Sequence, residues 1–318
     1  MTPYRNTVFI AILFFFGIST AFPQGCSDAG FCSMGAMKPD QPFNKKIEFK
    51  LRSMELSFYA GKTTLSPVVY VATADMNFSL NSKNSIQVKL PFQATTGNFG
   101  GAYSMGDISL CYTRNIISKE KYDINFSLGA KLPSNNSNLM EYREGKELPL
   151  PMYYQTSLGT YDAIAGVSFI SRDWLFATGI QHPFNQNENQ FKWSDWDPPV
   201  YPSPDYVHKY DLATNLKRGT DIMFRVERNF RFSRVNCSVG LLPIYRVTKD
   251  QIEDETGKLT KLDGTTGMAL SAIVTAGYSF NVRAGIKVLY GHKLMEREVN
   301  PDGLTRHSVT SVSYFYRF

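Results

Sequence analysis

Long segments of strict polar–apolar alternation constrain the fold of this chain more than any other feature of its sequence. From Tyr122 to Leu132 every second residue is apolar, and the residues between them are small, polar or charged. The same two-residue period runs through residues 86–93 and 268–279. Alternation of this kind is typical of a β-strand with one apolar and one polar face. Helical periodicity is almost absent after residue 45, so we expect an all-β fold.

The connections between the predicted strands alternate in length. We predict twelve strands, with short turns after the second, fourth, sixth, eighth and tenth and long loops after the third, fifth, seventh, ninth and eleventh. A transmembrane barrel of the outer-membrane type has short turns at the periplasmic end, long external loops and an even strand count. The predicted strands cover residues 46–60, 65–80, 84–93, 106–117, 121–132, 154–170, 173–184, 213–229, 232–246, 266–280, 281–293 and 306–318.

A secreted β-sandwich is the main structural alternative, because its strands also carry one apolar face. The predicted strands run 10–17 residues, whereas strands of globular proteins centre on about 5–6. The final predicted strand also has aromatic residues at alternate positions, an ending that resembles the signal read by the outer-membrane assembly machinery. These features favour an antiparallel up-and-down β-barrel over residues 45–318, embedded in the lipid of the cell outer membrane. The proposed insertion signal consists of Tyr314, Tyr316 and Phe318.

The first 21 residues have the three parts of a secretory signal peptide. Arg5 precedes an apolar run of 11 residues, Val8–Ile18, and the small residues Ser19–Ala21 follow. The run is too short to be a membrane-spanning helix, which takes about 20 residues. We therefore predict export of the protein, cleavage after Ala21 and an oxidising environment for its cysteines.

Residues 22–44 show no strand pattern and contain two cysteines, Cys26 and Cys32. The two lie close enough in sequence to form a disulfide that closes a small loop. A competing interpretation attaches a lipid to Cys26, although Pro23 stands where lipoprotein signals prefer Leu. Because a barrel of twelve strands is wider than one that its own side chains fill, we expect this segment to enter the lumen as a short plug. The alternative is a mobile periplasmic tail.

The polar faces of the strands must line the lumen, since a Lys or Arg facing lipid costs up to about 2–4 kcal/mol near the bilayer midplane. Charges of both signs fall on these faces, which predicts internal salt bridges rather than an ion filter of one sign. By the same alternation Cys111 faces the lumen and Cys237 the lipid. The predicted lumen-lining residues are Glu55, Asp75, Lys89, Asp107, Asp123, Lys131, Asp162, Arg225, Glu227, Arg283 and Lys287.

Short motifs in the middle of the chain resemble one family of such barrels. They are Gly106–Ile108, Leu132–Ser134, Ser157–Asp162, Phe184–Phe191 and Leu216–Gly219. The segment that contains them is similar to the phenol meta-degradation outer-membrane family, which is related to the long-chain fatty-acid transporters. This resemblance implies that hydrophobic or aromatic compounds cross the outer membrane through the protein. The Asn-Pro-Ala motif that fatty-acid transporters carry near the mature N-terminus is absent, and the Cys26–Cys32 segment stands in its place.

The segment 185–212 is unusually rich in aromatic residues and proline. It could form a vestibule that captures apolar solutes, or a surface that contacts a partner protein. Alternatively, its rings cover the rim of the barrel and have only a packing role. The candidates for solute capture are Trp193, Trp196, Tyr201 and Tyr206.

No catalytic, cofactor or metal site stands out in the sequence. An outer-membrane phospholipase needs a His-x-Ser pair, and none of the four histidines is followed two places later by Ser. The chain has a net charge of +6, and its basic residues are scattered among acidic ones. It therefore lacks the dense basic patch of a nucleic-acid-binding protein. We therefore expect a channel or transporter for small, hydrophobic or aromatic solutes. The alternative is a structural subunit whose external loops contact partner proteins.

Overall fold

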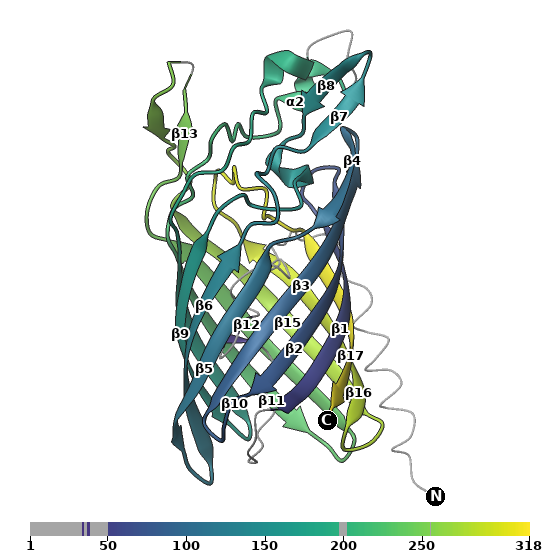
Figure 1. The fold of residues 1–318 in the computed structure, drawn as a ribbon, viewed down its shortest axis with the longest axis vertical. Coiled ribbons are helices and arrows are strands. Elements are labelled where there is room, and N and C mark those ends of the chain that lie inside the picture. The colour runs from purple at the N-terminus through teal and green to yellow at the C-terminus, as the bar shows by residue number, and fades with distance from the viewer. Residues whose placement is uncertain (1–33, 35–36, 39–49, 197–201, 255) are drawn as a thin grey trace, which may run out of the picture.

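The computed structural model describes residues 34, 37–38, 50–196, 202–254 and 256–318. Within this part of the chain, antiparallel strands form one closed barrel (Figure 1). The wall segments are β1 (Lys50–Lys62), β2 (Val68–Ser79), β3 (Asn84–Gly97), β4 (Gly100–Met105), β5 (Ile108–Ser118), β6 (Tyr122–Leu132), β9 (Asp162–Ser171), β10 (Trp174–Pro183), β11 (Asp221–Arg231), β12 (Val235–Arg246), β15 (Gly267–Ser279), β16 (Ala284–Met295) and β17 (Ser308–Arg317).

The wall has twelve strands, because β4 and β5 are successive parts of one strand that both pair with β3. Each strand pairs with its neighbours along the chain, and β1 closes the barrel by pairing with β17 from Lys62↔Ser308 to Ser53↔Arg317. Closure leaves no edge strand in the wall as far as the chain is described, which is the condition for a sheet to span a membrane. The short turns and the C-terminus lie at one end of the barrel and the long loops at the other (Figure 1), so the former end is periplasmic.

Side-chain burial alternates along the wall strands. In β10 exposed and buried residues alternate at every position, from exposed Trp174 to buried Pro183. Leu128 and Phe176 face outward with 50% and 43% of their surface exposed, whereas the inward-facing Lys131 has 1% exposed. The barrel thus has an apolar outer face and a largely polar interior, as a membrane-spanning barrel requires. The predicted all-β, up-and-down barrel is confirmed.

The long loops carry the remaining elements, which lie above the extracellular end of the barrel (Figure 1). No helix in the described residues is long and apolar enough to cross a membrane. The loop elements are the hairpin of β7 (Met140–Arg143) and β8 (Lys146–Pro149), the hairpin of β13 (Gln251–Glu253) and β14 (Leu259–Lys261), the 3-10 turns η5 (Met152–Tyr154) and η6 (Trp193–Trp196), and the short helix α2 (Pro204–Val207).

Two predicted strands begin too early. The strands predicted to start at residues 154 and 213 start at Asp162 and Asp221. The residues before them are mostly buried, but their backbone forms no ladder with a wall strand; Gln155, for example, bonds through its side chain to the backbone of Leu139. A buried extended loop and a strand end have the same apolar pattern, so periodicity could not separate them.

An interruption between β4 and β5 turns one acidic residue into the lumen. Pro91 of β3 has no N–H to donate, and the ladder changes partner here from Ser109 of β5 to Met105 of β4. The N–H of Gly106 donates to the carbonyl of Pro91 at 2.8 Å. This local break leaves Asp107 buried at the inner rim, where it reaches the loop that follows η5.

Candidate lumen passage

A polar vestibule occupies the periplasmic end of the lumen. It is a cavity of about 760 Å³, and its lining includes residues of the short turns, such as Asn81 and Lys119. Amide, hydroxyl and charged side chains make up most of its wall. The Asn115 side-chain amide donates to Asn125 Oδ1 at 2.9 Å, and the Gln87 amide donates to Asp75 at 2.9 Å. Polar solutes and water can therefore enter the barrel from this side.

A cluster of four charges lies at the inner end of the vestibule. Glu55 and Asp75 are direct cross-strand partners on β1 and β2, a position where like charges destabilise a sheet. Lys38 Nζ lies 2.9 Å from Glu55 Oε2 and 2.6 Å from Asp75 Oδ2, and Lys287 Nζ lies 3.0 Å from Glu55 Oε1. A cation from the N-terminal segment thus offsets the repulsion between two wall carboxylates.

Above these charges the lumen narrows to an apolar layer, which we call the waist. Met34 and Met37 have 1% and 0% of their surface exposed, and the Met37 N–H donates to the Met34 carbonyl at 2.9 Å. Arg225 Nη1 lies 3.5 Å from the Met37 carbonyl oxygen. Around the two methionines pack inward-facing wall residues from six strands: Cys111, Ile164, Ala177, Met223, Leu242 and Ile273.

The wall is hollowed where the methionines lie. Gly166 and Gly179 are cross-strand partners on β9 and β10, and a Cβ atom added to either would lie 2.7 or 2.2 Å from Met37 Sδ. A Cβ on Gly129 of β6 would likewise lie 3.1 Å from the Met34 terminal methyl. Because no residue other than glycine leaves this space, the recess and the two methionine side chains are complementary in shape.

Charged residues dominate the extracellular end of the lumen. Asp107 accepts hydrogen bonds from Ser157 Oγ at 2.5 Å and from the Leu158 N–H at 3.1 Å, and its carboxylate lies 3.3 Å from Lys131 Nζ. The neighbouring Asp162 forms a salt bridge with Arg218 of the β10–β11 loop. These contacts attach two external loops to the inner wall.

Arg246, the last residue of β12, joins three acidic residues. Its guanidinium lies 2.7 Å from Asp221 at the start of β11, 2.8 Å from Asp250 and 2.9 Å from Asp302. Burial raises the pKa of the Asp302 carboxyl, but the positive charges of Arg246, Arg297 and Arg218 outweigh burial, so the pKa lies below its usual value. This cluster was not predicted, because Asp250 and Asp302 are on different loops and follow no common spacing in the sequence.

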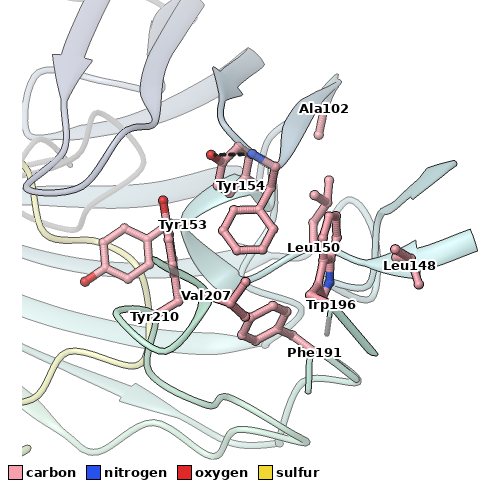
Figure 2. Close-up of a cluster of buried hydrophobic side chains, with 10 residues drawn as sticks. Ala102, Leu148, Leu150, Tyr153, Tyr154, Phe191, Trp196, Val207 and Tyr210 are labelled. Atoms are coloured by element: carbon pink, nitrogen blue, oxygen red, sulfur yellow. Dashed lines mark hydrogen bonds between the residues drawn. The ribbon is translucent and has the colours of Figure 1, made fainter. Parts of the chain in front are cut away.

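An aromatic cluster joins the external loops at the extracellular end of the barrel (Figure 2). Phe99 packs against Trp196 and Tyr210 with ring centroids 4.6 and 4.8 Å apart. The Trp196 Nε1–H donates to the Pro149 carbonyl at 3.0 Å, and the Tyr154 hydroxyl accepts the Phe99 N–H at 3.2 Å. Loops that follow β3, β6 and β10 therefore share one core, which we call the cap.

The aromatic candidates for solute capture are mostly part of this cap. Trp196 has no exposed surface, and Trp193 and Tyr206 are half-buried. Tyr201 lies outside the described residues. The Trp193 Nε1–H donates to the Tyr210 carbonyl at 2.9 Å. These contacts favour the packing role over solute capture.

Replacing Trp196 with alanine is expected to loosen the cap. The variant loses a buried ring and leaves the Pro149 carbonyl unsatisfied, a change that typically costs about 3–5 kcal/mol. Limited proteolysis of the external loops in outer-membrane vesicles should therefore be much faster in W196A. Trp174, which is 40% exposed on the outer face, supplies the control: W174A should be cleaved like the unaltered protein. Equal cleavage of W196A and W174A would contradict a packing role.

The predicted lumen-lining residues differ in their burial, and one of them lies outside the wall. Glu55 and Asp123 line the vestibule and are half-buried. The prediction for Arg283 is wrong: β16 begins at Ala284, so Arg283 lies exposed in the short turn after β15 rather than on a wall strand. The predicted residues that are buried are Asp75, Lys89, Asp107, Lys131, Asp162, Arg225, Glu227 and Lys287.

The remaining predicted residues lie at the waist, on the outer face or beyond the described residues. Cys111 is buried and Cys237 half-buried, and both are free thiols. Tyr314 and Phe318 are exposed and Tyr316 is half-buried at the periplasmic end of β17, and their role in insertion stays a prediction. The signal peptide, Cys26 and Cys32 lie outside the described residues.

Comparison with known proteins identifies the fold. No protein-family model and no curated sequence matches the chain. An outer-membrane channel from Pseudomonas putida F1 superposes with a TM-score of 0.59 at 11% identity, over 88% of this chain and 99% of that chain. The chain has the fold of an outer-membrane channel. This likeness confirms the class of barrel that the sequence motifs predicted.

Two further solved structures are similar at lower TM-scores. The CymD monoaromatic hydrocarbon channel matches with a TM-score of 0.42 and 11% identity, over 95% of each chain. The KdgM porin matches with a TM-score of 0.43 and 7% identity, over 84% of this chain and 99% of that chain.

Proposed function

We propose that the protein is an outer-membrane channel for small hydrophobic or aromatic solutes. The waist is the observation that carries this proposal. A porin for polar solutes has a polar, water-filled interior, whereas here Ile164, Leu242 and Ile273 converge on the middle of the lumen. An apolar constriction repels water and ions, while an apolar solute gains roughly 25 cal/mol per Å² of surface removed from water.

We propose that residues 22–44 form a plug that closes this passage. Met34 and Met37 fill the waist, and Lys38 ties the segment to Glu55 and Asp75. Passage of a solute then requires the plug to leave its recess. In this proposal a signal peptide over residues 1–21 directs export, and a Cys26–Cys32 disulfide stiffens the plug; no catalytic step is involved.

Solute uptake by reconstituted vesicles tests the proposed function. Vesicles with a lipopolysaccharide outer leaflet should admit a neutral monoaromatic compound faster when they contain the protein, and a monosaccharide of similar size should enter at the background rate. Faster entry of the sugar would indicate a general porin instead. Unchanged entry of both solutes would contradict a channel of either kind.

A structural subunit is the second candidate, and the two obstructions in the passage favour it. The cap joins the loops at the extracellular end and the methionines fill the waist, while the β13–β14 hairpin projects outward with exposed Leu259. The vestibule cavity shows, however, that side chains do not fill the whole lumen. If vesicles containing the plug variant M34A/M37A also admit neither solute, the structural role becomes the better account.

A further inference from the structure

A row of polar side chains crosses the outer face of the barrel at its extracellular end. Ser308 of β17 is the direct cross-strand partner of Lys62 on β1 and of His292 on β16. The alternation that buries Val309 and Gly291 in the interior turns Ser308 and His292 outward. Neighbouring strands are about 4.8 Å apart, so the three side chains form a continuous row that is about 10 Å long.

The row lies at the upper edge of the apolar band. The residues below it on the same strands include Phe58, Val288 and Val312, which are 55%, 41% and 41% exposed. At the corresponding ends of β6, β12 and β15 the outward-facing residues are apolar or aromatic, namely Leu132, Tyr245 and Met268. This level of the barrel is where the headgroups of the outer leaflet meet the acyl chains.

Most hydrogen-bond donors of this row have no partner within the described part of the chain. No ion pair of Lys62 and no hydrogen bond of the Ser308 hydroxyl occurs there, and the His292 ring contacts the Tyr290 hydroxyl at 3.4 Å through Nδ1 alone. The Lys62 carbonyl accepts the His307 N–H at 2.6 Å, which places a second imidazole next to the row. The ring centroids of His292 and His307 lie 6.4 Å apart.

Lys62 supplies the exposed positive charge of the row, whereas the buried Lys293 lies on the inner face of β16. The pKa of His307 is lowered by burial and by the positive charges of Lys293, His292 and Lys62, and only Glu296 acts in the opposite direction. Glu296 is itself ion-paired with Lys293. A cationic surface at headgroup level attracts anionic lipid.

We propose that Lys62, Ser308 and His292 bind the phosphate group of a phosphorylated lipid in the outer leaflet. An ammonium, a hydroxyl and an imidazole can each donate to a different phosphate oxygen, and hydrogen bonds to an ionised group are stronger than neutral ones. The apolar side chains below the row then contact the acyl chains of the same lipid. This site is separate from the lumen and does not depend on what the barrel transports.

Native mass spectrometry of the full protein in neutral detergent tests the site. The probes are a phosphorylated glycolipid, the same glycolipid after dephosphorylation, and inorganic phosphate. The unaltered protein should retain the phosphorylated form, and K62Q/H292Q should retain it at least tenfold more weakly. S308A, a smaller change, should weaken retention about threefold. The control K261Q/H182Q removes one exposed lysine and one exposed histidine elsewhere at the same end, and it should bind like the unaltered protein.

Three results would overturn the proposal. The first is equal retention by K62Q/H292Q and the control, which would show that the row does not bind lipid. The second is equal retention of the dephosphorylated glycolipid, which would show that phosphate is not recognised. The third is displacement of the lipid by inorganic phosphate at matched concentration, which would identify a site for free phosphate. Heat-dependent migration on gels confirms that each variant is folded.

Discussion

Replacing Met34 and Met37 with alanine is expected to raise the single-channel conductance of the barrel severalfold. The two thioether side chains fill the waist between Ile164 and Leu242, and their removal leaves a gap through which water can connect the vestibule to the upper lumen. Planar-bilayer recordings of the M34A/M37A variant measure the change directly. The proposed aromatic flux should rise in the same variant.

A matched variant separates this effect from a general loss of methionine. Met54 and Met76 are cross-strand partners on the outer face of β1 and β2, so M54A/M76A removes the same atoms without touching the lumen. Its conductance should equal that of the unaltered protein. Equal conductance of M34A/M37A and M54A/M76A would mean that the methionines do not close the passage.

The glycine recess provides an independent test of the same contact. In G166A/G179A the new Cβ atoms would lie 2.7 and 2.2 Å from Met37 Sδ, so the thioether must leave the recess. Conductance should rise in this variant. It should rise no further when M37A is added, because coupled changes at one contact are not additive. Additive increases would contradict the proposed docking of Met37.

Replacing Arg246 with methionine is expected to lower the free energy of unfolding of the extracellular end by about 3–5 kcal/mol, because the change leaves buried carboxylates without their cation. Asp221, Asp250 and Asp302 all lie within 3 Å of this guanidinium. Denaturant unfolding, combined with proteolysis of the loops, measures the loss. R228M is the control: the Arg228–Asp173 pair is exposed and 3.6 Å apart, and such pairs contribute about 0–1 kcal/mol.

The stability of the Arg246 variant should fall less with acid than that of the unaltered protein. The lowered pKa of Asp302 means that its stabilising contribution is present above the usual carboxyl pKa and is lost only as the pH falls through the lower folded value. Without Arg246 the largest of the charges that lower this pKa is gone and only Arg297 and Arg218 still act, so acidification should destabilise the extracellular end less in the variant. An equal loss of stability with acid in the variant and in the unaltered protein would contradict this account.

The sequence alone determined the wall of the barrel. The alternation from Tyr122 to Leu132 sets which face of β6 meets lipid, because strand geometry turns successive side chains to opposite faces without help from any distant residue. The alternation of short turns and long loops then predicted the closed antiparallel order and its orientation. Arg283 shows the limit of this local rule, since the period continues past the residue where pairing stops.

Tertiary structure alone decided the contacts inside the lumen, among the external loops and across the outer face. Met37 meets Gly166 and Gly179 only because the chain returns its N-terminal segment to the waist, and Arg246 meets Asp302 only because two loops fold over one rim. Closure of β1 on β17 likewise brings Lys62 beside Ser308. Each of these contacts joins residues far apart in the chain. Periodicity describes only neighbours along one strand, so the packing of distant segments leaves no trace in it.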